Sequence, residues 1–211
     1  MNRELEKVPI RLPTDETAAQ RLREWLEGEG GLDAVGLDLS GADLSYGDFS
    51  ESWFTEAKMV HVRLVQAELY RSDAQGADLR GADLTSASLV RVTLDDAMLG
   101  GAVLDAANLV KASLCDVDAA GASCRGTRFM GASLLGVDFG SADLRDAVFD
   151  ECSFRITVDD DTKLQGIRGS VFGPVTLRGG TGSRELSGVE LQEWLNQRGG
   201  KVRVLGANGV P

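Results

Sequence analysis

A period of five residues runs through the middle of this chain and limits what it can fold into. Every fifth residue from Leu39 to Phe154 is apolar, which makes 24 consecutive positions without a break in phase. The residue two places earlier in each unit is most often Ala, and its exceptions are small or of medium size. A period of five matches neither an α-helix nor a strand. It predicts a chain that turns a corner every five residues and points one large and one small side chain inward from each unit.

The repeating unit also identifies a family by resemblance. Its form is A(D/x)Lxx, seen most clearly as GADLS, GADLR and GADLT, and from about 36 to 156 it resembles the pentapeptide-repeat family. The resemblance implies an all-β solenoid, namely a right-handed quadrilateral β-helix with four units per coil. Twenty-four units then make six coils. At a strand spacing of about 4.8 Å the stack is roughly 29 Å tall.

The open ends of such a stack expose strand edges, so we expect a helical cap at each end. Residues 14–28 predict the first cap, a helix with Thr14 or Asp15 as its N-cap and an apolar stripe at helical spacing. That stripe contains Ala18, Leu22, Trp25 and Leu26.

The C-terminal end predicts a second module. Residues 162–182 are rich in Gly and indicate one degenerate coil, Ser187 begins a helix, and 201–205 forms a short strand. The predicted division is an N-terminal segment with its capping helix (1–35), the β-helix (36–156) and a C-terminal cap or dimerisation module (157–211).

No motif for catalysis or metal binding stands out. The single histidine, His61, falls at a corner, while Cys124 and Cys152 fall at inward positions and are expected to be core thiols. Cys115 is expected at the surface, and the acidic run 159–161 is expected to be solvated. Three cysteines without a CxxC pair indicate neither a disulfide framework nor a zinc site. We therefore expect a protein that is not an enzyme and that uses no cofactor or metal.

The charge balance bears on partners and compartment. With 22 basic and 33 acidic residues the net charge is −11, which opposes direct binding to nucleic acid or to an anionic membrane. The sequence has no N-terminal apolar stretch of signal-peptide type and no run of 18 apolar residues, so we expect a cytoplasmic protein.

Residues 20 apart should stack on one face, so the sequence predicts rows of side chains along the rod. Asp at this position either supports the turn through side-chain-to-backbone bonds or forms an acidic surface for a basic partner. A corner row of three cations is likewise either a screened structural feature or an alternative binding site. The predicted acidic rows are Asp38, Asp78, Asp118 and Asp138 on one face and Asp43, Asp83 and Asp143 on the next, and the basic row is Arg71, Arg91 and Lys111.

The C-terminal sequence narrows the resemblance. LSGVELQEWLNQRGG followed by KVRVL is most similar to the fluoroquinolone-resistance proteins of the Qnr and MfpA type, which are dimeric rods that mimic DNA and bind DNA gyrase. The resemblance implies a non-catalytic partner of gyrase or another topoisomerase, one that modulates the enzyme or confers resistance to drugs directed at it. The chain has no loop inserted between coils, so protection of gyrase by such a loop is not implied.

The C-terminal helix carries an apolar set that must be buried, either in a homodimer or against the chain itself as a simple cap. The set is Val189, Leu191, Trp194 and Leu195. The alternative function is a structural or regulatory scaffold for an unknown protein partner, with the basic row or the surface near Trp53 and Phe54 as its binding site.

Overall fold

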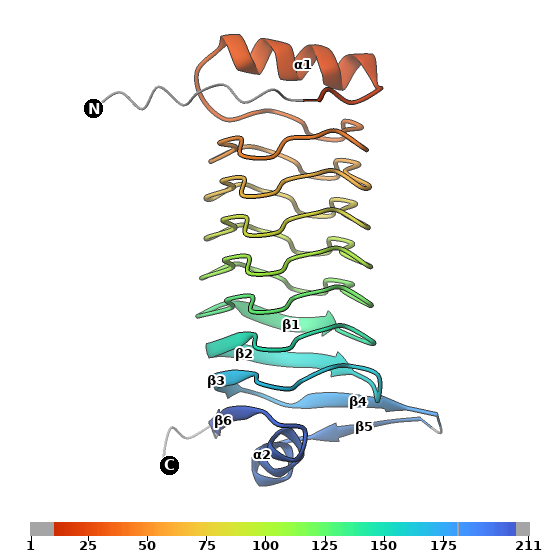
Figure 1. Ribbon diagram of the computed structural model, residues 1–211, viewed down its shortest axis with the longest axis vertical. Coiled ribbons are helices and arrows are strands. Elements are labelled where there is room, and N and C mark those ends of the chain that lie inside the picture. Colours follow the sequence, from red (N-terminus) through yellow and green to blue (C-terminus); the bar gives the residue numbers. More distant parts are fainter. Residues whose placement is uncertain (1–10, 181, 206–211) are drawn as a thin grey trace, which may run out of the picture.

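The protein is a stack of coils that ends in a small strand-rich module (Figure 1). The computed structural model describes residues 11–180 and 182–205. Parallel bridges join residues 20 apart at four positions in each coil, and they continue along the stack as far as the bridge from Asp143 to Lys163. The chain is therefore a β-solenoid whose coils are 20 residues long.

The hydrogen bonds of one unit explain why the five-residue sequence repeats. In the unit from Leu79 to Asp83, the N–H of Ala82 donates to the Leu79 carbonyl (3.0 Å) and closes the corner. The N–H groups of Leu79 and Gly81 donate to the following coil, and that of Asp83 donates to the preceding coil. The N–H of Arg80 has no backbone partner and donates to Oδ1 of Asp78 (3.3 Å). Every backbone donor of the unit is thus satisfied, with one bond supplied by the Asp of the repeat.

The corner residue, two places after the large inward residue of a unit, has a positive φ, which is the left-handed region that favours glycine. Gly81, for example, has φ 64° and Gly101 has φ 65°. Within residues 11–180 and 182–205, fifteen residues other than Gly adopt the same conformation, among them Arg91 with φ 61°. Because the corner bonds impose this conformation, charged side chains can occupy the corners of the rod.

The interior is filled by the positions that the period predicts. All 24 large inward residues from Leu39 to Phe154 are no more than 3% exposed, and Cys124 and Cys152 are buried with them. Residues one coil apart lie directly over one another, as the stacked rings of Phe129 and Phe149 show with centroids 4.9 Å apart. The sequence prediction of the core is therefore confirmed.

Helix α1 (Glu16–Glu27) lies across the N-terminal end of the stack (Figure 1). Asp15 is its N-cap and accepts the N–H of Ala18 at 2.8 Å. Ala18 and Leu22 join the core, and Trp25 stacks on Phe49 at 4.8 Å. The apolar stripe that predicted this helix is the face that it packs against the coils.

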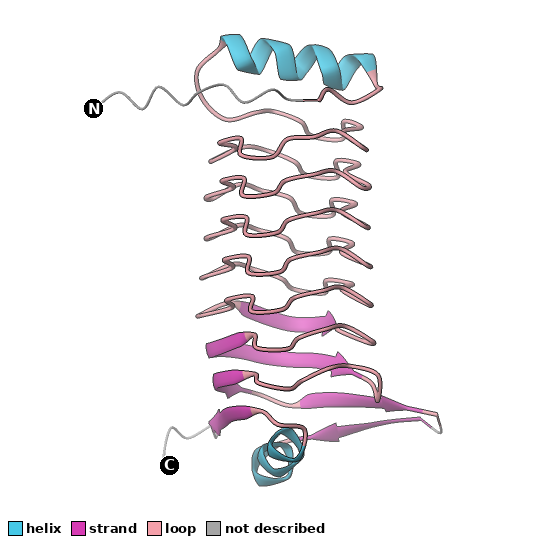
Figure 2. Cartoon of the chain, viewed as in Figure 1, coloured by secondary structure: helices cyan, strands magenta, loops and turns pink. Residues whose placement is uncertain are grey.

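The regular strands lie in the last coils of the stack and in the C-terminal module (Figure 2). Strands β1 (Ser133–Asp138), β2 (Val148–Val158), β3 (Arg168–Phe172), β4 (Val175–Gly179) and β6 (Lys201–Leu205) pair in parallel, whereas β5 (Gly182–Leu186) pairs antiparallel with β4. The coil register slips between Leu135 and Val137, after which Asp138 pairs with Thr157. The sequence period ends at Phe154, but the coiling continues into β4.

Helix α2 (Gly188–Gln197) follows β5 and packs against β6, which pairs with β3. The Gln192 side chain accepts the N–H of Val204 at 2.9 Å, and its own amide donates to the Val202 carbonyl. Arg198 lies 4.1 Å from the centre of the Trp194 ring. Neither helix in the described ranges has the length and apolar character needed to cross a membrane.

Candidate partner-binding surfaces

The seven predicted aspartates form two rows along the rod, as the bridges from Asp38 through Asp138 and from Asp43 through Asp143 show. Each of them accepts, through Oδ1, the N–H of the residue two places ahead, at 2.9 to 3.3 Å. Asn108 makes the same bond to Val110 at 3.4 Å. Asp at this position therefore supports the turn, and its repetition alone is not evidence of a partner.

Several of these carboxylates are also paired with cations of the same chain. In the second row, Asp143 contacts Arg145 at 2.6 Å and Asp43 contacts Arg63 at 3.7 Å. In the first row, Asp78 contacts Arg80 and Asp138 contacts Arg178, both at 2.6 Å. The remaining three, Asp38, Asp83 and Asp118, have no ion pair within the described part of the chain.

Two of the paired carboxylates, Asp78 and Asp143, are held in their charged form. The hydrogen bond from the Arg80 side chain lowers the pKa of Asp78, and that from Arg145 lowers the pKa of Asp143. Burial opposes both shifts without reversing them. Much of the negative charge of the second row is thus neutralised locally, and the first row is the more acidic of the two.

A corner beside the first row adds carboxylates that the sequence analysis missed. Glu56, Asp96 and Asp116 occupy left-handed corner positions two residues before that row and are exposed. No backbone N–H in the described ranges donates to them, whereas the adjacent Asp95 accepts from Ser113 and from the Cys115 N–H. The sequence signal was the same 20-residue spacing, but at the corner position, two residues after each large inward residue.

Together the first row and this corner form the acidic side of the rod. We define it as Asp38, Glu56, Asp78, Asp95, Asp96, Asp116, Asp118 and Asp138. Lys58 lies in the row, and Arg80 and Arg178 pair with two of its members, which leaves a net charge of −5. Five coil spacings of about 4.8 Å make roughly 24 Å, or about one charge per 5 Å. One strand of DNA carries one per about 3.4 Å.

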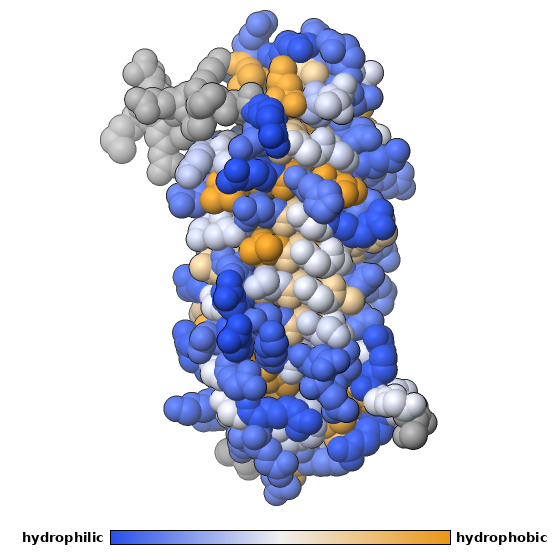
Figure 3. All heavy atoms as spheres, turned by 45° about the vertical axis from the view of Figure 1, so that its right-hand side comes forward, coloured by the Kyte–Doolittle hydropathy of each residue, from blue (hydrophilic) through white to orange (hydrophobic). Residues whose placement is uncertain are grey.

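The cations of the predicted basic row are stacked on a different corner. Arg71, Arg91 and Lys111 have φ between 56° and 61°, are exposed, and form no ion pair among residues 11–180 and 182–205. The guanidinium of Arg71 lies 5.2 Å from the centre of the Tyr70 ring. The hydropathy of the surface also varies. In Figure 3 a pale strip of intermediate hydropathy follows the axis between strongly hydrophilic zones.

The helix residues predicted to dimerise are divided by the structure. Leu191, Trp194 and Leu195 are buried within the chain itself, and Val189 is 74% exposed. Of the two alternatives, packing against the chain accounts for three of the four side chains. Dimerisation stays a prediction, and of this set Val189 alone has a largely exposed side chain for it.

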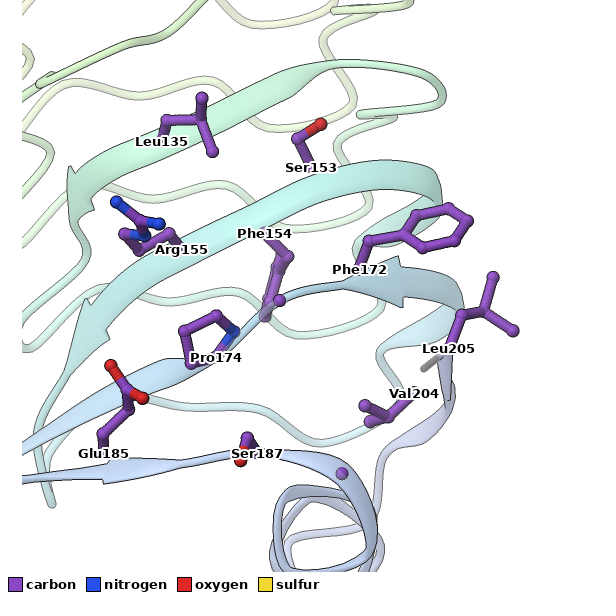
Figure 4. Close-up of a pocket in the computed structure, with 12 residues that line it drawn as sticks. Leu135, Ser153, Phe154, Arg155, Phe172, Pro174, Glu185, Ser187, Val204 and Leu205 are labelled. Carbon is purple, nitrogen blue, oxygen red and sulfur yellow. The ribbon is translucent and has the colours of Figure 1, made fainter. Parts of the chain in front are cut away.

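A groove of about 560 Å³ lies near the start of α2, where Ser187 and Gly188 line it (Figure 4). Leu135, Phe154 and Phe172 lie along one side of it, and Val204 and Leu205 lie at the end of β6. Leu135 is 41% exposed and Phe172 is 43% exposed. Neither was predicted to be a surface residue, because Leu135 sits at a turn position and Phe172 lies beyond the regular repeat.

The other predicted polar positions make local contacts. His61 is exposed, with Nδ1 3.4 Å from the Gly81 carbonyl oxygen, and Asp159 accepts N–H groups of Ser141 and Asp161. Burial raises the pKa of the Cys152 thiol to about 11. Within the described ranges no three His, Cys, Asp or Glu side chains converge in a way that could hold a metal.

These features define a class of protein: a repeat-built β-solenoid with no catalytic family indicated. Pentapeptide repeats match residues 31–59, 63–101 and 97–136 in eight copies. The chain belongs to the pentapeptide-repeat family.

Solved structures of this family are similar to the chain. HetL from the cyanobacterium Nostoc sp. strain PCC 7120, a pentapeptide-repeat protein involved in regulating heterocyst differentiation, is 27% identical with a TM-score of 0.62, covering 71% of this chain and 70% of HetL. QnrB1, a plasmid-mediated fluoroquinolone-resistance protein, is 19% identical with a TM-score of 0.30, covering 66% and 90%. A protein of the Arabidopsis thaliana thylakoid lumen is 34% identical with a TM-score of 0.26, covering 54% and 72%. No curated protein sequence matches the chain.

Proposed function

We propose that this protein is a non-catalytic binding protein whose acidic side occupies a basic groove that normally holds DNA, with DNA gyrase or another topoisomerase as the partner. The observation that carries the proposal is the corner formed by Glu56, Asp96 and Asp116. These carboxylates accept no backbone N–H group in the part of the chain that the structure describes, so the fold does not require their charge. Together with the first acidic row they form the acidic side, which has one net negative charge per about 5 Å of rod length.

A regular rod suits this role because its charges lie at fixed intervals on a stiff support. The backbone at the corner and row positions is held by hydrogen bonds between coils, so little backbone ordering remains to oppose binding. Complementary charge accelerates association and weakens as salt rises. Gyrase is the proposed enzyme because the C-terminal sequence resembles the Qnr and MfpA type, and modulation of the enzyme or resistance to drugs directed at it would follow from such binding.

The test is ATP-dependent supercoiling of relaxed plasmid by purified gyrase, titrated with this protein. We expect inhibition that declines as salt is raised. A variant with Glu56→Gln, Asp96→Asn, Asp116→Asn and Asp118→Asn should need at least about tenfold more protein, ~1.4 kcal/mol, for the same inhibition. Of these four residues, only Asp118 belongs to the first row and makes the turn bond. Because Asn108 makes the same bond, Asn at position 118 should keep it.

A matched control changes the same number of charges on the other faces. Asp48→Asn, Glu68→Gln, Asp73→Asn and Glu151→Gln lie outside the acidic side, and inhibition should change less than about twofold, ~0.4 kcal/mol. Equal loss in both variants would reduce the effect to overall charge. Supercoiling unaffected by the folded wild-type protein would remove gyrase as the partner.

The proposal includes an assembly, in which a right-handed quadrilateral rod capped by α1 and α2 forms a homodimer through its C-terminal module in the cytoplasm. Val189, Leu135 and Phe172 are exposed apolar side chains of this region, and no strand of the described chain pairs with the outer edge of β6. A second copy would cover both features. Light scattering at tens of micromolar should give the mass of two chains, and a monomer mass would contradict the dimer.

A further inference from the structure

From Arg91 onward the basic row lies in a part of the rod that has no carboxylates, whereas Arg71 lies between Glu68 and Asp73 on its coil. Three consecutive coils contribute residues 88–93, 108–113 and 128–133, and none of these residues is Asp or Glu. They contain Arg91, Lys111 and Arg128, and Arg71 lies one coil above. In a chain with 33 acidic residues and a net charge of −11, these coils form an exposed strip of positive charge.

The cations of this strip are free to bind a partner. Arg71, Arg91 and Lys111 make no ion pair with any residue in the described ranges, while Arg128 contacts the sulfur of Met130 at 3.6 Å. By contrast, Arg80, Arg125 and Arg145 elsewhere on the coils are bound to aspartates. Four unpaired like charges on neighbouring coils repel one another, and an acidic partner would relieve this repulsion.

An apolar row runs directly beside the cations. Each corner cation follows one member of the row in sequence, so the two rows rise together along the rod. Tyr70 is 36% exposed, and the members below it are half-buried. The row consists of Tyr70, Val90, Val110 and Met130.

We propose that this strip, defined as Tyr70, Arg71, Val90, Arg91, Val110, Lys111, Arg128 and Met130, binds an acidic amphipathic α-helix of a partner protein along the rod axis. The coils repeat about every 4.8 Å. A helix rises about 5.4 Å per turn, so one acidic and one apolar side chain per turn stay close to one cation and one apolar residue per coil. Over three coils the mismatch is under about 2 Å, which flexible Arg and Lys side chains can follow.

Charge and position distinguish this occupant from others. Nucleic acid also carries negative charge, but it would approach a rod with a net charge of −11. The apolar row and Arg128 lie about half a coil from the first acidic row, whereas Arg91 and Lys111 lie at the corner one unit before that of Asp96 and Asp116. The strip shares no residue with the acidic side, so each surface can be tested with its own variants.

The probe for this proposal is a fluorescein-labelled helical peptide of about four turns, built on Ala with one Glu and one Leu per turn on adjoining stripes. Fluorescence anisotropy should show binding to the full-length wild-type protein. The variant Arg71→Glu, Arg91→Glu, Lys111→Glu should weaken that binding at least about tenfold, ~1.4 kcal/mol. Replacing the Glu residues of the peptide with Lys should abolish binding.

The matched control reverses three exposed cations on β3 and β6, with Arg168→Glu, Lys201→Glu and Arg203→Glu. It should change affinity less than about twofold, ~0.4 kcal/mol. A second variant, Arg91→Gln with Lys111→Gln, covers the case in which the triple reversal melts the rod, and it should still weaken binding several-fold.

Three results would overturn the proposal. One is failure of the wild-type protein to bind the peptide, and another is equal loss of affinity in the strip and control variants. The third is a duplex DNA or a second copy of this chain that binds the strip more tightly than the peptide, since the occupant would then belong to another class.

Discussion

The coil stack and the C-terminal module are built on different principles. In the stack, one hydrogen-bond pattern is repeated with little change from coil to coil, as the bonds of Leu79 to the following coil and of Asp83 to the preceding coil illustrate. Toward the module the register slips near Gly136, and within the module β5 runs antiparallel and single contacts such as Arg178 to Asp138 join it to the stack. The stack is a support whose surface can vary at every corner, whereas the module depends on particular residues.

The two regions therefore tolerate amino-acid substitutions at different kinds of position. A corner of the stack accepts Gly, Ser, Asp or Arg, since the same backbone bonds form around each of them. Binding surfaces can therefore change on the stack without altering its fold. The module exposes Phe172 and Val189 and buries Trp194, so its surface and its core come from the same short segment.

The largest effect is expected from a charge in the stack interior. Leu84→Asp places an unpaired carboxylate at a site that is 1% exposed, and the cost of burying it should unfold the rod. Circular dichroism and thermal melting should show the loss. Ser86→Asp is the matched control, because Asp96 and Asp116 already occupy equivalent corners, and it should melt like the wild type. A native spectrum for Leu84→Asp would refute the inward assignment.

A smaller and more local effect is expected in the module. Leu191→Ala removes a fully buried side chain from α2 and should cost about 2–5 kcal/mol. Because each coil contacts only its neighbours, amide hydrogen exchange should accelerate over about 165–205 and stay slow in the coils from 40 to 130. Acceleration throughout the rod would show that the two regions unfold as one.

Glycine substitutions should differ between the regions. A Cβ at Gly169, where φ is 121°, would lie 1.9 Å from the Phe149 carbonyl oxygen, so Gly169→Ala should cost at least about 2 kcal/mol. A Cβ at Gly100 meets nothing closer than 3.8 Å. Gly100→Ala should leave chemical denaturation unchanged, and equal destabilisation by the two would contradict the described β2–β3 contact.

Acid should weaken the coil surface by the smallest amount. The pKa of Asp78 and that of Asp143 are lowered in the folded chain, chiefly by hydrogen bonds from Arg80 and Arg145. Their stabilisation is therefore present above the unfolded-state pKa near 4 and is lost as pH falls through the lower folded values. Urea denaturation between about pH 5 and pH 2 should show this decline, and Asp78→Asn with Asp143→Asn should flatten it. If the double variant lost stability with falling pH as steeply as the wild type, these ion pairs would not contribute to the pH dependence.

The repeat made the stack predictable, because one period specifies corner, core and register together. Every fifth residue from Leu39 to Phe154 is buried as predicted, and β6 has the predicted bounds. The slip at Leu135 and the β4–β5 hairpin could not be predicted, since they depend on contacts between residues far apart in sequence.

The candidate surfaces were predictable in part. The two Asp rows follow from the 20-residue spacing. The pairing of Asp138 with Arg178 depends on how the module folds back, and no sequence pattern indicates it. The carboxylates of Glu56, Asp96 and Asp116 carried the same spacing, but they lie at a different position of the unit.

Competition for DNA tests the central proposal most directly. A fluorescently labelled duplex bound to gyrase should be displaced by this protein, and its anisotropy should fall to the value of free DNA as the protein is added. Displacement should need less protein at low salt, and the Glu56→Gln, Asp96→Asn, Asp116→Asn, Asp118→Asn variant should displace the duplex at least about tenfold less effectively. A duplex that stays bound at saturating concentrations of the folded protein would contradict the claim that the acidic side takes the place of DNA.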